Sequence, residues 1–206
     1  MRSDILRKPE IDEMLGNATT LYNGKRLQCI IAIAWLFGKR INEILRLKRE
    51  NIWTDENFLY VRFLVSKKKA RKTTPVPKPF VKRIRLEHPY TQFVLDHIQK
   101  FEEGYIFPSY GKDRIIRVIN KETGKLYEYH KSGGYLSDSR VKQQLKQINP
   151  NAWWHLFRES LATYMAERGA TEEELMHWFD WDRVDTAHQY VKRGTKLTEK
   201  WSKRRF

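Results

Sequence analysis

The most informative stretch of this chain is residues 155–190, which read HLFRESLATYMAERGATEEELMHWFDWDRVDTAHQY. Four side chains that can donate hydrogen bonds follow one another in it at intervals of three, 23 and nine residues: His155, Arg158, Trp181 and Tyr190. Apolar positions recur at helical spacing from Trp154 to Arg168, and Gly169 is a suitable residue to end that helix. His155 and Arg158, three residues apart, are therefore expected on one helix face.

Two further helices are expected to carry the later residues. Thr171 to Glu174 has the pattern of a capping box, which opens a short helix that leads to Trp181. Asp185 is a suitable N-cap for a following helix that carries Tyr190. Local pattern thus predicts three consecutive helices over this part of the chain.

A second arginine lies far upstream, at Arg40 in the sequence GKRINEIL of residues 38–45. Attack on a phosphodiester builds negative charge on its non-bridging oxygens, which guanidinium groups match bidentately at any usable pH. Preorganised donors of this kind are usually the largest catalytic contribution. His155 and Trp181 can add N–H donors, and Tyr190 can supply an oxygen nucleophile if cationic neighbours activate it. This chemistry needs no metal ion, and no cofactor is expected.

The order and spacing of these residues resemble the C-terminal half of the tyrosine recombinases, the phage-integrase-like enzymes. The second box of that family is His-x-x-Arg, followed by a histidine or tryptophan and then by the nucleophilic tyrosine. Arg40 resembles the first-box arginine, Glu43 resembles its acidic companion, and Pro9 to Leu21 resembles the helix that opens the catalytic domain. The resemblance covers nearly the whole chain. It implies a mainly helical α+β fold, the DNA breaking-rejoining enzyme fold, with a small β-sheet or hairpin after the first arginine box.

The family also implies a general-acid lysine on that hairpin. Phe58 to Val65 has the composition of a strand, and Thr73 to Pro77 is expected to return beside it. Lys67 is favoured as the catalytic lysine because a Ser-Lys pair at the strand end resembles the family arrangement, and Lys69 is the next candidate. The loop cations expected to bind the DNA substrate are Lys68, Lys69, Arg71 and Lys72.

Charge supports a nucleic-acid partner. The net charge is +15, and it is concentrated in two blocks: residues 60–90 carry ten Lys or Arg against one Glu, and residues 191–206 carry seven against one. Such clusters are typical of proteins that bind polyanions, although a basic surface can also serve solubility alone. Because the blocks flank the candidate site, double-stranded DNA is the expected partner.

Composition excludes several other classes of protein. A content of 40% hydrophobic and 13% aromatic residues argues against disorder. The single cysteine, Cys29, rules out an internal disulfide and zinc clusters built on cysteine pairs. No run of about 18 apolar residues exists, so no membrane association is expected. We expect a cytoplasmic, nucleoid-associated protein of prokaryotic, viral or plasmid origin.

The rest of the chain shows no internal repeat and predicts one catalytic unit over residues 1–206. A buried helix is expected from Lys25 to Phe37 and a continuation from Ile41 to Leu47, which places Arg40 at a bend after Gly38. The other predicted elements are a helix over Tyr90–Phe101, a hairpin of Arg114–Asn120 with Leu126–His130, and a helix from Ser137 or Asp138 to Ile148.

Two features depart from the family pattern. Its members usually carry a separate N-terminal domain that closes around the duplex, and this chain starts too late to contain one, so a catalytic fragment of a longer integrase is expected. Asp180 stands where a glycine is common, and an inward-facing carboxylate there is expected to impair catalysis. His177 precedes Tyr190 by 13 residues rather than nine, so Trp181 is preferred as the family residue.

The resemblance implies site-specific recombination. Tyr190 is expected to attack duplex DNA and form a 3′-phosphotyrosine, with strand transfer completed in a synaptic tetramer on paired sites. Three alternatives stay open from sequence: a type IB topoisomerase that relaxes DNA as a monomer, a basic DNA-binding module without turnover, and an RNA-binding or nuclease-like protein.

Overall fold

The computed structural model describes residues 5–64, 79–109, 114–119, 126–131 and 134–202. Its elements are, in chain order, α1 (Lys8–Ala18), α2 (Gly24–Phe37), α3 (Ile41–Leu45), a 3₁₀ turn (Arg49–Asn51), β1 (Ile52–Thr54), β2 (Phe58–Phe63), β3 (Phe80–Arg85), α4 (Thr91–Ile98), β4 (Arg114–Ile119), β5 (Leu126–Lys131), α5 (Asp138–Ile148), α6 (Trp154–Glu167), α7 (Glu172–Phe179) and α8 (Val184–Ser202). This is the mainly helical α+β fold that the sequence predicts, with the small sheet after the first arginine box.

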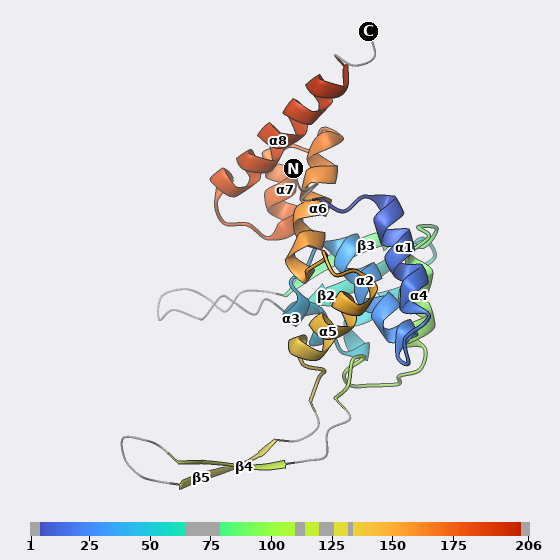
Figure 1. The fold of residues 1–206 in the computed structure, drawn as a ribbon, viewed down its shortest axis with the longest axis vertical. Helices are drawn as coiled ribbons and strands as arrows, with labels where there is room; N and C mark the ends of the chain where they lie inside the picture. The colour runs from blue at the N-terminus through green and yellow to red at the C-terminus, as the bar shows by residue number, and fades with distance from the viewer. Residues whose placement is uncertain (1–4, 65–78, 110–113, 120–125, 132–133, 203–206) are drawn as a thin grey trace.

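Helix α2 is the centre of the helical body (Figure 1). All of its residues except Lys25 are buried, and it contacts α1, α4, α5 and α6. A helix that is apolar around most of its circumference is expected in such an interior position. Cys29 lies fully inside it, where burial raises the pKa of the thiol well above its usual value, so the thiol is inert.

The chain bends sharply where α2 ends. Gly38 adopts the left-handed conformation with φ 58°, and a Cβ at this position would collide with the ring of Phe179. Only glycine satisfies both conditions at low cost. Helix α3 then begins at Ile41, so Arg40 lies in the bend, as predicted.

Strands β1, β2 and β3 form an antiparallel sheet in that order. The register pairs Trp53 with Tyr60 in β1 and β2, and Tyr60 with Arg83 in β2 and β3. Leu59 and Val61, on the opposite face of β2, are fully buried in the main core. The sheet therefore covers one side of the helical body and leaves its aromatic and basic face outward.

The sequence pattern did not identify β3. The predicted return strand, Thr73 to Pro77, lies outside the described residues, and the strand that pairs with β2 is Phe80–Arg85. Lys82 occupies a buried, inward position of β3 opposite Val61. A lysine at that position breaks the apolar alternation by which a strand is recognised.

Strands β4 and β5 form the predicted second hairpin, with Ile116 opposite Tyr129 and Val118 opposite Tyr127. Figure 1 shows this hairpin extending away from the helical body, between α4 and α5 in the chain. It pairs with no other strand in the described parts of the chain.

Helices α6, α7 and α8 form the C-terminal layer, which Figure 1 shows at one end of the molecule. They share a second, smaller core that includes Leu161, Leu175 and Phe179. The capping box at Thr171 is confirmed, since its hydroxyl accepts a hydrogen bond from the backbone of Glu174. Helix α8 begins two residues earlier than predicted, so Asp185 lies in its first turn instead of at its N-cap.

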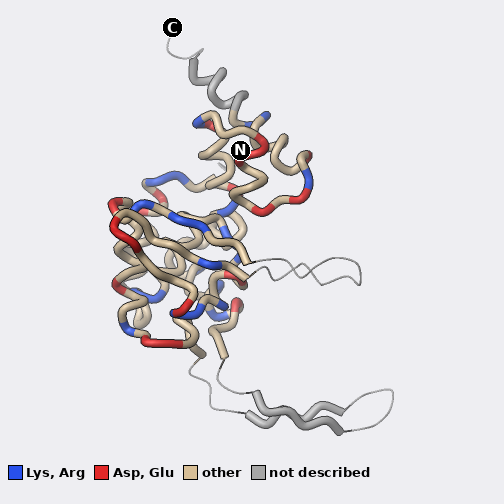
Figure 2. Tube along the Cα trace, turned by 180° about the vertical axis from the view of Figure 1, so that it is seen from behind, with Lys and Arg blue, Asp and Glu red and all other residues tan. Residues whose placement is uncertain are grey.

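Residues of both charge signs are distributed along the whole described trace (Figure 2). Residues 65–78, which hold much of the first basic block, lie outside the described residues. Among the helices that could be searched, none is long and apolar enough to cross a membrane.

Candidate active site

Arg158 is the most constrained side chain of the candidate site. It projects from α6, is only 2% exposed, and its Nη1 donates to the carbonyl of Gly38 at 2.7 Å. Its Nη2 donates to the carbonyl of Phe179. The guanidinium carbon lies 5.0 Å from the ring centre of Phe179 and 5.5 Å from that of Trp181. Two hydrogen bonds and two aromatic contacts thus hold Arg158 in one orientation.

Arg158 remains cationic in this setting. Burial and, to a lesser extent, the nearby charge of Arg40 lower its pKa, Glu43 and Asp180 oppose them, and the net result is a pKa of about 10. A pKa of about 10 still leaves the group almost fully protonated at neutral pH. The influence of Arg40 also shows that the two arginines of the predicted clamp lie within electrostatic range of each other.

Arg40 lies at the more open side of the site. Its side chain is 36% exposed, and its Nη1 lies 3.4 Å from Oε1 of the buried Glu43. Glu43 also accepts the backbone N–H of Arg40 at 3.1 Å, which holds the bend before α3. The expected neighbour of Arg40 is therefore present, and it supports an arginine that still faces solvent.

Trp181 connects the arginines to Tyr190. Its ring stacks on Phe179 at 4.8 Å and on Tyr190 at 5.1 Å, with interplanar angles of 21° and 14°. Phe179 ends α7 and Tyr190 lies on α8, so this stack fixes the two helices relative to each other. The spacing of nine residues that favoured Trp181 corresponds to direct ring contact.

The electrostatic environment of Tyr190 differs from the prediction. Burial raises its pKa, and Glu159 raises it further, while the cations Arg158 and Arg193 lower it. The cationic neighbours expected from sequence are present, but burial is the larger influence and the net pKa shift is upward. Glu159 and Arg193 were not identified from sequence, because neither belongs to a recognised motif.

His155 lies at the edge of the site. Its side chain is 57% exposed, and its Nε2 is 3.5 Å from Glu159 Oε1, one turn along α6. Because Glu159 influences Tyr190, His155 is connected to the tyrosine through this carboxylate. The structure thus brings Arg40, Arg158, Trp181 and Tyr190 together and places His155 beside them.

The predicted loop cations cannot be placed, since Lys67, Lys68, Lys69, Arg71 and Lys72 lie outside the described residues. The ends of the strands that flank this loop can be placed.

The rings of Phe63, at the end of β2, and Phe80, at the start of β3, lie 5.3 and 5.8 Å from the Nζ of Lys39. Lys39 directly precedes Arg40, so the loop leaves and re-enters the fold beside the first arginine.

Asp180 faces inward, but it does not face the arginine pair directly. It has a φ of 54° and caps α7 in the left-handed conformation, which Asp and Asn tolerate better than most residues. Its carboxylate pairs with Lys39, and its Oδ1 lies 3.5 Å from the Nζ of Lys82. The expected impairment presumed an uncompensated charge, and the two lysines compensate it.

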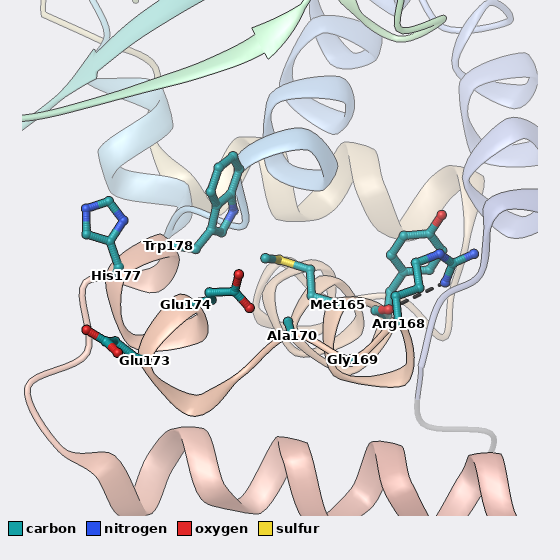
Figure 3. A pocket seen from close by; sticks show the side chains of 9 residues that line it. Met165, Arg168, Gly169, Ala170, Glu173, Glu174, His177 and Trp178 are labelled. Carbon is teal, nitrogen blue, oxygen red and sulfur yellow. Dashed lines mark hydrogen bonds between the residues drawn. The ribbon is translucent and has the colours of Figure 1, made fainter.

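His177 lines one pocket together with Asp180 and Trp181, and it also contributes to a second one. Together with Trp178 and Met165 it lines a pocket of about 730 Å³ between the end of α6 and α7 (Figure 3). Among the described residues, neither Arg158 nor Tyr190 lines that pocket. In the same described segments, no group of three or more His, Cys, Asp or Glu side chains is arranged to hold a metal ion.

Comparison with known proteins identifies one matching family and one related recombinase. A family sequence model described as Phage integrase family matches residues 4–196. Over 170 residues the chain is 26% identical to a tyrosine recombinase XerD of Caulobacter vibrioides, in an alignment that covers 81% of this chain and 50% of that protein.

Two solved structures have a similar fold. The XerH site-specific recombinase bound to difH substrate, in a pre-cleavage complex, matches 91% of this chain and 50% of its own with a TM-score of 0.61 and 13% identity. The XerA recombinase matches 98% of this chain and 64% of its own with a TM-score of 0.62 and 14% identity. The chain thus spans about half the length of the curated relative it matches.

Proposed function

Because the chain belongs to the phage integrase family, we propose that it is the catalytic domain of a site-specific tyrosine recombinase that acts on duplex DNA. The observation that supports this proposal most directly is the stack of Trp181 on Tyr190, with the Arg158 guanidinium beside the same indole. A nucleophile and a phosphate-binding cation are held by one rigid aromatic contact.

The proposed reaction is a transesterification. The Tyr190 hydroxyl loses its proton to solvent as its oxygen attacks the scissile phosphorus, the bond from phosphorus to the 5′ oxygen breaks, and a 3′-phosphotyrosine forms. The departing 5′ oxygen takes up a proton, for which we propose Lys67 as the donor. A 5′-hydroxyl of a partner strand then attacks the phosphotyrosine and releases the tyrosine. Each step exchanges one phosphate ester for another, so the reaction needs no external energy source.

The arginines have complementary roles in this proposal. Arg158 is already fixed by two backbone carbonyls, so it can stabilise the developing charge without reorganisation. Arg40 is partly exposed and can close on a second non-bridging oxygen when DNA enters. His155 and Trp181 would donate further hydrogen bonds to the same oxygens.

The decisive experiment is covalent trapping. The protein is incubated with a library of nicked duplexes of randomised sequence, in which the short cleaved strand diffuses away, and adducts are separated on a denaturing gel. We expect an adduct with the wild-type protein and none with Tyr190→Phe, which should still bind DNA. Tyr164→Phe, a substitution of the same kind on α6, should still form the adduct.

The trapped DNA also distinguishes the alternatives. Sequencing it reveals the preferred site, and a supercoiled plasmid with two copies of that site reports the outcome. Exchange between the sites supports a recombinase, whereas relaxation without exchange supports the topoisomerase alternative. Absence of any wild-type adduct, with binding retained, would leave only a DNA-binding module.

We further propose that the protein assembles as a synaptic tetramer on two DNA sites, in the cell compartment that holds the DNA. Mass photometry with and without duplexes carrying the trapped site tests this assembly. A species of four chains and two duplexes is expected. A single chain per duplex at all concentrations would contradict the tetramer and agree with a monomeric topoisomerase.

A further inference from the structure

A buried ion pair joins the two backbone segments that hold Arg158. The guanidinium donates to the carbonyls of Gly38 and Phe179, and the residues that follow each of these are Lys39 and Asp180. Lys39 and Asp180 form an ion pair across 141 positions of sequence. Arg158 and this ion pair therefore bridge the same two segments side by side.

A third charged side chain completes the cluster. The Nζ of Lys82 lies 3.5 Å from Asp180 Oδ1 and donates to the carbonyl of His177 at 2.5 Å. Lys82 lies on β3, whose first residue, Phe80, ends the loop of predicted DNA-binding lysines. We refer to Lys39, Asp180 and Lys82 as the buried triad.

The buried triad connects the segments that carry the candidate active site. Lys39 precedes Arg40 in the bend, and Asp180 precedes Trp181 at the end of α7. Lys82 anchors the strand that leads from the hairpin loop. A shift of Asp180 would thus change the position of Trp181 and the carbonyl that orients Arg158.

Stability alone does not account for this arrangement. The side chains of Lys39, Asp180 and Lys82 are 2%, 8% and 4% exposed. Removing charges from water is so costly that apolar replacements of buried ion pairs are often neutral or stabilising. The cluster also holds two ammonium groups against one carboxylate. The three buried charges are therefore better explained by the backbone arrangement that they impose than by a contribution to the free energy of unfolding.

We propose that Asp180 is a positioning residue for DNA cleavage, acting through Lys39 and Lys82 to fix Arg158, Arg40 and Trp181 in one arrangement. This inference rests on the proposed function, because the arrangement matters only if these residues act on a phosphodiester. Asp180 itself contacts none of the reacting atoms. Its negative charge and its left-handed backbone are the two properties that the role requires.

The informative variant is Asp180→Asn. Asparagine keeps the shape and tolerates the left-handed conformation, but it removes the charge. Asp185→Asn is the matched control, because that carboxylate is 81% exposed and pairs only loosely with Arg183, at 3.5 Å. Both variants change the net charge equally.

The first measurement needs no DNA. In ¹⁵N-arginine spectra, assigned with Arg158→Lys, the Arg158 guanidinium protons should exchange slowly in the wild type and in Asp185→Asn. In Asp180→Asn we expect exchange faster by on the order of tenfold, because the segments that hold the guanidinium separate more easily. Unchanged exchange would overturn the proposal.

Stability against pH gives an independent signature of the triad. Burial lowers the pKa values of Lys39 and Lys82, and Asp180 opposes that shift in both. Other charges that face the cluster are Glu43, which favours the charged form of Lys39, and Arg158, which disfavours that of Lys82.

Without Asp180 the folded-state lysine pKa values should fall further. The unfolded state then binds more protons, so the melting temperature of Asp180→Asn should rise with pH from neutrality toward about 10 relative to wild type. If the melting temperatures of wild type and Asp180→Asn change with pH in parallel, the electrostatic coupling within the buried triad is contradicted.

The cleavage measurement decides the positioning role. On the trapped DNA site we expect Asp180→Asn to cleave 10- to 100-fold more slowly at saturating DNA, in line with a displacement of about 1 Å, while its Kd changes little. A wild-type cleavage rate in Asp180→Asn would sink this inference and leave the recombinase proposal standing. Failure of the wild type to form any adduct would instead sink the proposed function, and the positioning role with it.

A further variant separates positioning from folding if Asp180→Asn is too unstable to study. Lys39→Met, Lys82→Met and Asp180→Asn together remove all three buried charges, so stability should recover at least partly. Cleavage should stay slow, because the ion pair no longer fixes the bend against the end of α7, which leaves Arg158 and the packing of Phe179 on Gly38 between them. Recovery of both stability and cleavage would show that the triad serves folding only and would overturn the proposal.

Discussion

At the scale of single residues, Tyr190 is subject to opposing charges. Arg158 and Arg193 favour its phenolate form, whereas burial and Glu159 disfavour it and raise the pKa. Attack on phosphorus requires the phenolic proton to leave. The carboxylate of Glu159 is thus an unfavourable neighbour for the nucleophile, and its contact with His155 keeps it in place.

Replacing Glu159 should therefore change the pH dependence of cleavage. In Glu159→Gln the neutral amide no longer disfavours the phenolate, so the pKa of Tyr190 falls and a larger fraction of it is ionised at any pH below that pKa. The alkaline rise in single-turnover cleavage rate should move to lower pH and increase the rate severalfold at neutrality. Glu173→Gln, an exposed substitution on α7, should leave the profile unchanged, and an unshifted Glu159→Gln profile would contradict the assignment.

At the scale of secondary-structure elements, the position of Tyr190 depends on how closely α8 approaches α6. A Cβ built on Gly194 would lie 2.8 Å from the carbonyl carbon of Ala166 in α6. No side chain fits there without moving the helix. Because Tyr190 lies one turn earlier on α8, a displaced helix would alter its stack on Trp181.

Gly194→Ala should accordingly destabilise the protein and slow cleavage. Overpacking of this kind costs about 1–3 kcal/mol in the free energy of unfolding, measurable by urea denaturation. Gly16→Ala is the control, since nothing lies within 4 Å of its added Cβ in α1, and it should stabilise the protein by roughly 0.5–1 kcal/mol. Normal stability and cleavage in Gly194→Ala would show that α8 can shift freely.

The loop between β2 and β3 carries a second prediction at this scale. If Lys67 protonates the leaving oxygen, Lys67→Ala should slow cleavage by on the order of 10²–10⁴. A substrate with sulfur in place of the 5′ bridging oxygen has a leaving group that needs no proton, so it should restore the rate. Lys69→Ala is the comparison, and selective rescue of that variant instead would assign the general acid to Lys69.

At the scale of the whole molecule, the net charge of +15 should appear as a strong salt dependence of DNA binding. Each phosphate contact contributes about −0.9 to the slope of log K against log salt. Replacing Lys68, Lys69, Arg71 and Lys72 by Gln should therefore reduce the slope by up to about four, measured by fluorescence anisotropy over a salt series. An unchanged slope would mean that this block serves solubility rather than DNA binding.

Much of the fold could be predicted because its signals are local. The capping box at Thr171, the bend at Gly38 and the apolar helix around Cys29 each depend on residues within a few positions of one another. These three features follow from backbone preferences and helical periodicity, which act over short stretches of chain. The choice of Trp181 over His177 came instead from the family resemblance, and in the structure Trp181 stacks on Tyr190.

What the sequence determined by itself is thus the set of helices, the position of the bend and the identity of the side chains that meet. Only the tertiary structure decided how their charges are balanced. The negative charge of Asp180 is unfavourable when only the neighbouring sequence is considered. In the fold this charge is balanced, because Lys39 and Lys82 come from distant parts of the chain and pair with it. Electrostatic energy in a protein interior depends on distances and burial, and neither is encoded in residue order alone.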